Sequence, residues 1–450
     1  MKVEKSLLWA VIVAALGSVN FGINMAAIAG AVSSIKEHFL LSEFQIGLVV
    51  SGLVIGCMIG AFSSGSVSEK IGRKKVLIGT GVLFVISGVG SALSQSMIQL
   101  VIARLIGGIG VGAVSVMVPT YISEIALPKV RGTLGTFNQL GVVLGILGAY
   151  VFDYYMLNDT EGWRWMLASQ VFIAVPMIVL MLINFPESPR WLVLKGYKEE
   201  AFRVLSKVAG TNNAQSEYDT IVAGIEADQK KSGKGVKFSS LFKGKLRKVV
   251  FLGVMLAAFQ QITGINAIIS YAPTIFNQTG VGSDLALLQS IMVGVVNVLF
   301  TLVAVWLIDK LGRKKLLLLG TGGMSLSLTY LVVAFVTGNA NSLGVLISIL
   351  GYIAFFAASL APVMWVVTSE IYPNKIRGIA MSLSTAVSWV CTFVVVQFFP
   401  WMLNGLGGAV AFGFFLFFTV WAFLFILVKI PETKGKLLEV IEEELGLLAK

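Results

Sequence analysis

Charged residues are scarce in this chain. Asp, Glu, Lys and Arg make up 13% of its 450 residues, whereas a soluble domain carries about 25%. Cysteine and histidine are scarcer still, with two cysteines and one histidine. Cys57 and Cys391 lie inside apolar stretches and His38 stands apart from both, which excludes a Cys/His metal cluster and gives no sign of a disulfide scaffold.

The motifs of enzymes and of ATP-driven pumps are also missing. The longest polar segment, residues 190–246, contains no Gly-rich phosphate loop, no metal-ligand spacing and no nucleophile–base set. The sequence therefore predicts a protein that is not an enzyme and needs no cofactor or metal.

Long apolar runs are abundant. Hydrophobic residues make up 56% of the chain, and the mean hydropathy is +0.88. A helix needs about 20 apolar residues to cross a bilayer, and the sequence predicts twelve such spans. They are 7–31, 45–68, 76–95, 98–122, 131–153, 164–185, 247–276, 285–308, 316–337, 343–369, 378–402 and 407–429.

Positive charge is confined to one side of these spans. All Lys and Arg residues except Lys36, Arg104 and Arg164 fall in the tails, in the loops that follow even-numbered spans, or at the span ends next to them. This bias is typical of cytoplasmic loops, so both termini are predicted to be cytoplasmic in a multi-pass cell-membrane protein. Topology accounts for the net charge of +11, and no nucleic-acid partner is expected.

Three pairs of motifs recur in the same order at nearly constant spacing. Residues 69–75 resemble 309–315, Ser-Glu-Ile and Arg-Gly within 123–132 recur within 369–378, and 186–190 resemble 431–435. Such a repeat indicates two six-helix halves in the same orientation, with a site between them near the midplane. The predicted parts are 1–189 (N-terminal half), 190–246 (cytoplasmic helical linker), 247–430 (C-terminal half) and 431–450 (cytoplasmic tail).

The repeated charges at the ends of the spans predict a gate. Carboxylates and guanidiniums can pair across the two halves through charge-assisted hydrogen bonds and close the inner mouth in one state. Alternatively, these charges only anchor the topology. The predicted gate residues are Glu124, Arg131, Glu187, Arg190, Asp309, Arg313, Glu370 and Arg377.

These motifs resemble the sugar-porter family of the major facilitator superfamily. The resemblance is carried by Pro-Glu-Ser-Pro-Arg-Trp at 186–191, Pro-Glu-Thr-Lys-Gly at 431–435 and the paired Gly-Arg-Lys-Lys loops, and it covers residues 7–440. It implies an all-α integral membrane fold of twelve helices, with the linker as a small cytoplasmic insertion. It also implies alternating access for a monosaccharide, with a hexose such as glucose expected. The working form in the lipid bilayer is expected to be a monomer.

The resemblance also implies where sugar binds. Amides both donate and accept hydrogen bonds, as sugar hydroxyls do, and aromatic faces cover the apolar face of a sugar ring. A helix break at Gly264 is expected, because one ideal helix would not point Gln260 and Asn266 the same way. Alternatively, each amide only bonds a neighbouring helix. The implied positions are Gln139, Gln260, Gln261, Asn266, Asn297, Phe356, Trp365, Trp389 and Thr392.

Four positions depart from the family pattern. Ala361 replaces a glycine before the proline of the tenth span, and Ala357 replaces a glutamate of glucose facilitators. Thr392 replaces an amide, and Ile269 replaces an aromatic residue. These departures leave the particular sugar open.

The coupling mode is predicted from the first and fourth spans. Proton–sugar symporters of this family carry an aspartate in the first span, thought to pair with an arginine in the fourth. Here the arginine is Arg104, but the first-span position is Asn24, which cannot carry a proton. All 23 acidic residues lie in loops, in tails or near the ends of spans. Facilitative uniport is therefore predicted.

Other modes stay open. A proton-coupled sugar or polyol symporter is the main alternative, with coupling at another site such as Asp153 or through sodium bound by backbone oxygens. A sugar sensor with a transporter fold is disfavoured by the short segment after Pro431.

Overall fold

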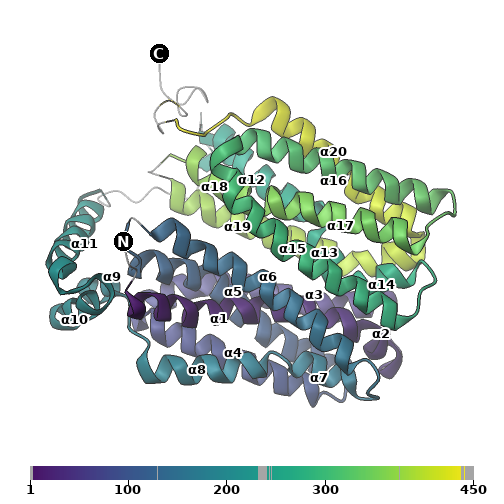
Figure 1. Cartoon of the computed structure of the whole chain (residues 1–450), viewed down its shortest axis with the longest axis horizontal. Helices are drawn as coiled ribbons and strands as arrows, with labels where there is room; N and C mark the ends of the chain where they lie inside the picture. Colours follow the sequence, from purple (N-terminus) through teal and green to yellow (C-terminus); the bar gives the residue numbers. More distant parts are fainter. Residues whose placement is uncertain are drawn as a thin grey trace. The chain divides into compact units, whose positions relative to one another are not determined.

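The computed structural model describes residues 4–128, 130–231, 241–242, 244, 246–373, 376–436 and 440, without the side chains of residues 227–231 and 309. Every regular element in these ranges is helical (Figure 1). Twelve segments are long and apolar enough to cross a membrane. The predicted all-α fold with twelve spans is confirmed.

The first six spans are single helices or pairs of consecutive helices. In chain order they are α1 (Lys5–Ala26) with α2 (Ile28–His38), α3 (Glu43–Ile71), α4 (Arg73–Ala92), α5 (Met97–Ile125), α6 (Arg131–Met156), and α7 (Gly162–Ala168) with α8 (Val171–Asn184). Three helices follow in the polar linker: α9 (Pro189–Leu194), α10 (Lys198–Ala209) and α11 (Thr211–Lys231).

The last six spans are interrupted more often. They are α12 (Leu246–Ile262) with α13 (Ile265–Ser270), α15 (Ser283–Leu311), α16 (Arg313–Val336), α17 (Ser342–Ala358) with α18 (Leu360–Ile371), α19 (Arg377–Trp401) with the π-helical turn η2 (Met402–Leu406), and α20 (Gly408–Lys429). The short helix α14 (Ala272–Asn277) connects α13 to α15. Pro362 lies in the first turn of α18, where the missing N–H of proline leaves no helical hydrogen bond unmade.

The chain forms two compact units, each of which is discontinuous in sequence. Unit 1 comprises Met1–Asn24, Ile55–Ala149 and Arg164–Gly235. Unit 2 comprises Met25–Val54, Tyr150–Trp163 and Val236–Lys450. Unit 2 therefore contains the second set of spans together with one end of the first, second and fifth spans. The domain boundaries predicted from the sequence stay a prediction.

Equivalent helices pack together in the two halves of the sequence. In unit 1, α4 packs against α5 and α8, and in unit 2, α16 packs against α17 and α20. These are the third, fourth and sixth spans of each half. The internal repeat thus extends from sequence motifs to helix packing.

Glycines allow neighbouring spans of unit 1 to approach closely. A Cβ atom added at Gly56 or Gly60 of α3 would lie 2.0 Å from a backbone carbonyl oxygen of α5, that of Leu105 or Ile109 respectively. Small residues at such spacing are how membrane helices pack, because lipid supplies no hydrophobic force between helices.

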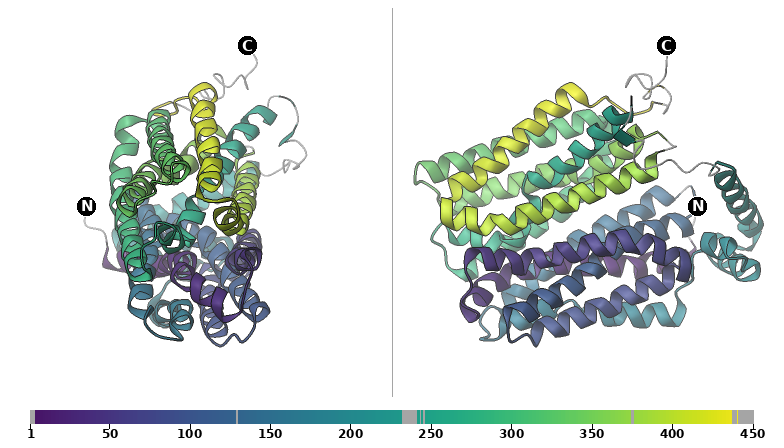
Figure 2. Two further views of the ribbon diagram at one scale, coloured as in Figure 1. Left: turned by 90° about the vertical axis from the view of Figure 1, so that its right-hand side faces the viewer. Right: turned by 180° about the vertical axis from the view of Figure 1, so that it is seen from behind.

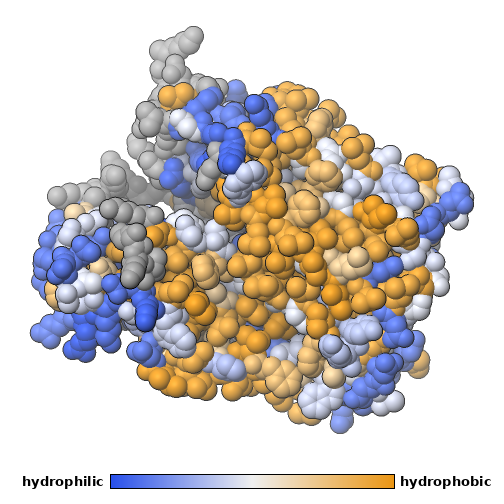
Figure 3. Space-filling view, viewed as in Figure 1, coloured by the Kyte–Doolittle hydropathy of each residue, from blue (hydrophilic) through white to orange (hydrophobic). Residues whose placement is uncertain are grey.

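The surface of the helices is strongly apolar. Large side chains such as Ile183 and Leu326 are about three-quarters exposed, at 74% and 75%, as expected where lipid surrounds the protein. Figure 3 shows hydrophobic residues over the membrane-spanning helices and hydrophilic residues over α10 and α11. Within unit 1, these two helices lie beyond the end at which α1 begins (Figures 1 and 2).

Candidate functional site

The seventh span breaks at Gly264, as predicted. α12 ends at Ile262, Gly264 has φ of +103° in the left-handed region, and α13 begins at Ile265. A Cβ at Gly264 would lie 2.6 Å from the ring of Phe415, so glycine is required by both conformation and space. The Tyr352 hydroxyl donates to the Thr263 carbonyl oxygen at 2.9 Å, which provides a partner for backbone freed by the break.

Three predicted amides form one hydrogen-bonded chain across this break. Asn266 Nδ2 donates to Gln261 Oε1 at 2.6 Å, and Gln261 Nε2 donates to Gln260 Oε1 at 3.1 Å. Gln260 Nε2 in turn donates to the Leu360 carbonyl oxygen at 3.0 Å, at the start of α18. The break therefore brings Gln260 and Asn266 into one network, which a continuous helix would not do. We call these three residues the amide chain.

The amide chain runs from a buried end to a partly exposed end. Gln260 is 4% exposed, whereas Gln261 and Asn266 are half-buried. A carboxamide has two donors and an acceptor oxygen with two lone pairs, and the hydrogen bond from Asn266 to Gln261 uses one donor. The half-buried end retains the capacity to donate to and accept from a ligand hydroxyl.

The predicted aromatic residues lie on helices of unit 2. Phe356 of α17 is buried and stacks on Tyr352, with ring centroids 6.4 Å apart. Trp365 of α18 and Trp389 of α19 are half-buried, and both of their helices pack against α12, which carries Gln260 and Gln261. Helix packing thus places both tryptophans on helices next to the amide chain.

The remaining predicted sugar positions do not join the amide chain in the described structure. The Thr392 hydroxyl donates to the Ser388 carbonyl oxygen at 2.9 Å within α19. Asn297 is buried on α15, and Gln139 is half-buried on α6 in unit 1. Their roles in binding sugar stay predictions.

The predicted coupling positions are both buried in unit 1. Asn24 is 3% exposed and Arg104 is 4% exposed. Asn24 Nδ2 donates to the Asn20 carbonyl oxygen at 2.9 Å, and its Oδ1 lies 3.1 Å from where a Cβ at Gly107 would stand, one turn along α5 from Arg104. α1 and α5 thus hold the two side chains in the same region.

The repeated charges form matching ion pairs within each half. In the first half, Arg73 Nε and Nη2 donate to the two oxygens of Glu124, each at 2.9 Å. In the second half, Arg313 Nη2 donates to Glu370 Oε1 at 3.1 Å. The two-bond geometry of the first pair is the stronger arrangement. Its arginine, Arg73, was absent from the predicted gate, although the repeat pairs it with Arg313.

A second carboxylate in each half caps a helix N-terminus. Glu187 Oε1 accepts from the backbone N–H of Arg73 at 2.9 Å, and Glu432 Oε1 accepts from that of Arg313 at 2.9 Å. The next amides, of Lys74 and Lys314, donate to the same carboxylates. Because the first N–H groups of a helix have no partner within it and carry partial positive charge, a carboxylate is favoured there.

Glycine at the preceding position makes room for each of these caps. Gly72 and Gly312 have φ of +97° and +87°. A Cβ there would lie 2.1 Å from Glu187 Oε2 and 2.7 Å from Glu432 Oε2, respectively. The Gly-Arg loops and the Pro-Glu segments are therefore two parts of one contact, which occurs once in each half.

The two caps differ in their electrostatics. Burial raises the pKa of Glu187, and the hydrogen bonds from the Ser188, Lys74 and Arg73 amides only partly oppose this. Burial also acts to raise the pKa of Glu432, but there the backbone hydrogen bonds outweigh it, and the pKa is lowered. The more exposed position of Glu432 accounts for the difference.

The other predicted gate residues have varied surroundings. Arg131 Nη2 donates to the Ala126 carbonyl oxygen at 3.4 Å, and Arg377 Nε donates to the Tyr372 carbonyl oxygen at 3.2 Å, an equivalent contact in each half. Arg190 is exposed, and the side chain of Asp309 is outside the described residues. Pairing of these charges across the halves stays a prediction.

Comparison with known proteins decides the family. The model of the family described as "Sugar (and other) transporter" matches residues 10–445. The chain is 38% identical to the arabinose-proton symporter of Bacillus subtilis (strain 168), over 96% of this chain and 93% of the relative. It is 37% identical to the D-xylose-proton symporter of Escherichia coli (strain K12), over 96% and 94% of the two chains. It is also 38% identical to a glucose transporter of Staphylococcus epidermidis, over 99% and 98%.

A solved structure agrees with these relatives. The inward-open conformation of the xylose transporter from E. coli matches with a TM-score of 0.86 at 36% identity, covering 97% of this chain and 99% of that one. The chain belongs to the sugar-porter family of the major facilitator superfamily. It is a sugar transporter of twelve spans and not an enzyme.

Sequence reasoning missed several buried amides of this transporter, and Gln397 is one of them. Gln397 of α19 is 2% exposed; its Oε1 accepts from the Ser51 hydroxyl at 2.7 Å, and its Nε2 donates to the Phe44 carbonyl oxygen at 3.0 Å. It thus connects α3 to α19 within unit 2. A search for every amide inside an apolar span would have found it, whereas matching to a family pattern did not.

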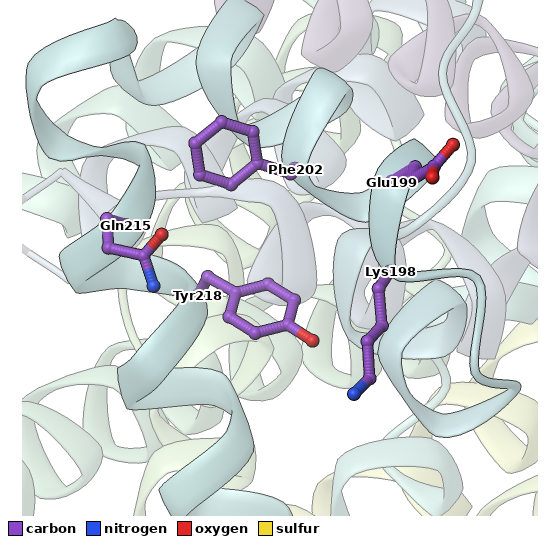
Figure 4. Close-up of a pocket in the computed structure, with 5 residues that line it drawn as sticks. All are labelled: Lys198, Glu199, Phe202, Gln215 and Tyr218. Atoms are coloured by element: carbon purple, nitrogen blue, oxygen red, sulfur yellow. The ribbon is translucent and has the colours of Figure 1, made fainter.

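A surface pocket on the polar linker lies outside the twelve spans of the transporter. Its volume is about 400 Å³, and Figure 4 shows the side chains of α10 and α11 that line it. The lining residues are Lys198, Glu199, Phe202, Gln215 and Tyr218. Because none of them belongs to a membrane-spanning helix, this pocket is not part of a transport path.

Proposed function

We propose that this chain carries a monosaccharide across the membrane by alternating access, in symport with a proton. The observation that carries the proposal is the amide chain of Gln260, Gln261 and Asn266 at the break in the seventh span. A row of linked carboxamides inside a membrane helix is costly unless it meets polar partners. Sugar hydroxyls are partners that both donate and accept.

The proposed substrate class is an aldose of five or six carbons. Relatives of similar identity over nearly the whole chain are named for arabinose, xylose and glucose, which favours a monosaccharide without choosing between pentose and hexose. The departures at Ala357 and Thr392 are compatible with either. A polyol is the rival substrate.

Proton coupling replaces the uniport predicted from Asn24. Two of the relatives are named as proton symporters, and the comparisons give uniport no support. Asn24 still cannot carry a proton, so symport requires a proton-binding group elsewhere in this chain. Uniport is therefore the rival mechanism that an experiment on coupling must exclude.

The proposed orientation places both termini in the cytoplasm. An even number of spans leaves both ends on one side of the membrane, and the Lys- and Arg-rich loops lie on that same side. The gate charges Glu124, Arg131, Glu370 and Arg377 would then face the cytoplasm. A monomer in the lipid bilayer is the proposed working form.

Uptake by the purified protein in proteoliposomes tests this proposal. Labelled glucose, xylose and arabinose are expected to enter and to compete with one another, whereas polyols compete weakly. Gln261→Ala, which interrupts the amide chain, is expected to weaken sugar binding by about 1–3 kcal/mol because it leaves polar partners unpaired.

The matched control is Gln215→Ala, which removes an exposed amide of α11 outside the membrane. It is expected to bind sugar as the parent does. Equal sugar affinity in Gln261→Ala and the parent would show that the sugar site lies elsewhere.

A further inference from the structure

An acidic side chain is completely buried near the end of the fifth span. Asp153 lies one turn before the end of α6 and is 0% exposed. Its Oδ2 accepts from the backbone N–H of Gly30 at 3.2 Å, and its Oδ1 has no hydrogen-bond partner among the described residues. A Cβ at position 30 would lie 2.7 Å from Asp153, so a glycine there allows the contact.

The helix α2 that contacts Asp153 brings no cation to it. Its ionisable residues are Lys36, Glu37 and His38, which begin six residues beyond Gly30, about 9 Å along the helix axis. Lys36 forms an ion pair with Glu43, and His38 packs against the rings of Phe39 and Trp163.

The short helices that pack against α2 carry no charge either. α13 and α14, which pack against α2, have no charged residue in their sequences. On α6, the Tyr150 hydroxyl donates to the Ile269 carbonyl oxygen at 2.7 Å, whereas Tyr154 and Tyr155 point to the exposed surface. In the described structure, Asp153 therefore has one backbone N–H and no counter-ion.

An ionised carboxylate in such surroundings is unfavourable. A charge buried without a partner is normally neutralised by taking up or losing a proton. Ionisable residues inside membrane spans are for the same reason rare, and they often belong to proton paths. Close packing of α2 against α6 therefore favours the neutral, protonated form of Asp153.

We propose that Asp153 is the proton-binding group of this transporter. In this step one O–H bond forms on the Asp153 carboxylate and one breaks in a hydronium ion, which leaves water, on the side of the membrane opposite the termini. Protonation permits α2, α6 and α13 to pack, which closes that end of unit 2. Loss of the proton favours an opened, hydrated end.

The same short helix links this group to the amide chain. Tyr150, one turn before Asp153, bonds the backbone of α13 at Ile269, and α13 carries Asn266, the half-buried end of the amide chain. A sugar on Asn266 and a proton on Asp153 therefore both act on the position of α13. This inference rests on the proposed symport and assigns its proton site.

Asp153→Asn tests the assignment, because asparagine keeps the shape of the side chain and cannot release a proton. In proteoliposomes, the parent is expected to accumulate sugar under an inward proton gradient, and the variant only to equilibrate it, with an inside-to-outside ratio of one. Exchange of internal for external sugar is expected to persist in the variant. The control Asp159→Asn, at an exposed loop position, is expected to accumulate sugar like the parent.

Infrared spectroscopy gives a direct second measurement on the folded parent. The carbonyl band of a protonated carboxylic acid is expected in the parent, shifted in Asp153→Glu and absent in Asp153→Asn. Absence of that band from the parent overturns the assignment even if Asp153→Asn fails to fold.

The outcomes separate this inference from the proposed function. Proton-driven accumulation by Asp153→Asn overturns the role of Asp153 and leaves symport standing. Absence of proton-driven accumulation by the parent overturns symport, and the inference with it, while sugar uptake down its own gradient leaves monosaccharide transport intact.

Discussion

Glu187 and Glu432 each connect two distant segments of one half through a single carboxylate. Each lies just after the last span of its half and accepts the first backbone N–H groups of that half's third span. The motif residues around them are explained by this contact, since Gly72 and Gly312 clear the space and the following arginines supply the amides. The short motifs therefore have a structural role, which is to cap a helix in each half. A role in gating would be additional to this.

The two caps are predicted to respond oppositely to pH. The pKa of Glu432 is lowered in the folded protein, so its ionised form adds stability above the ordinary glutamate pKa of about 4.3, and this is lost as pH falls through the folded pKa. The destabilisation caused by Glu432→Gln should therefore be largest near neutral pH and shrink in acid.

The pKa of Glu187 is raised, so its ionisation opposes folding as pH rises from about 4.3 through the folded pKa. The destabilisation caused by Glu187→Gln should accordingly shrink toward neutral pH. Thermal unfolding in detergent across this range measures both differences from the parent. Parallel pH profiles for the two variants would contradict the opposite shifts.

Individual site residues could be predicted from the sequence more easily than the residues to which they are hydrogen-bonded. Amides inside apolar spans are recognisable, and Gln261 and Asn266 do meet. The contact between Gly30 and Asp153 could not be inferred, because it joins helices far apart in the chain and depends on how closely two backbones approach.

Interrupted helices are the feature that organises the second half at the scale of elements. The seventh span breaks at Gly264, and the tenth breaks at Ser359 between α17 and α18. The two breaks meet, since Gln260 before the first one bonds the Leu360 carbonyl oxygen just after the second. Backbone groups freed by breaks need partners inside a membrane, and an amide side chain supplies one here.

Substitution of Gly264 by alanine is predicted to destabilise the protein more than the same substitution at Gly280. Gly264→Ala would force alanine into a left-handed conformation, at about 1–2 kcal/mol, and would press a methyl group onto Phe415, adding about 1–3 kcal/mol of overpacking. Gly280→Ala has a similar φ of +80° but nothing within 4 Å, so it is expected to show only the first cost.

Thermal unfolding of the two variants in detergent measures this difference, and sugar affinity reports whether the amide chain is displaced. Gly264→Ala is expected to lose stability and affinity together. Equal stability of the two variants would show that the ring of Phe415 moves aside at little cost.

The break at Gly264 was predictable because Gln260 and Asn266 were both expected to contact sugar, and one continuous helix would not point them the same way. The break before α2, at Ala27, carries no such signal. It lies within apolar sequence where local composition favours a continuous helix, and packing decides.

The number of spans is the property of the whole molecule that sequence determines most firmly. Lipid excludes charge from about 20 consecutive residues per helix, which leaves a pattern visible without any tertiary information. The grouping of the ends of the first, second and fifth spans with the second half was not predictable. It depends on contacts such as Ser51 with Gln397, between residues far apart in the sequence.

Orientation in the membrane is predicted for the whole molecule and can be measured with single cysteines. In a background where Cys57 and Cys391 are replaced by serine, Asp159→Cys is expected to react with an impermeant maleimide on intact cells. Lys198→Cys on α10 is expected to react only after permeabilisation. Both positions are exposed, and the reverse pattern of labelling would overturn the proposed topology.

The paired caps bear on ancestry as well as on architecture. Each consists of a left-handed glycine, two helix-start amides and a carboxylate from a segment more than a hundred residues later in the chain. A device of that many parts, present once in each half and in the same order, indicates descent from a single six-helix ancestor that already possessed it. The cap would then be older than the gene duplication. The opposite pKa shifts of Glu187 and Glu432 would have arisen afterwards, as the surroundings of the two carboxylates diverged.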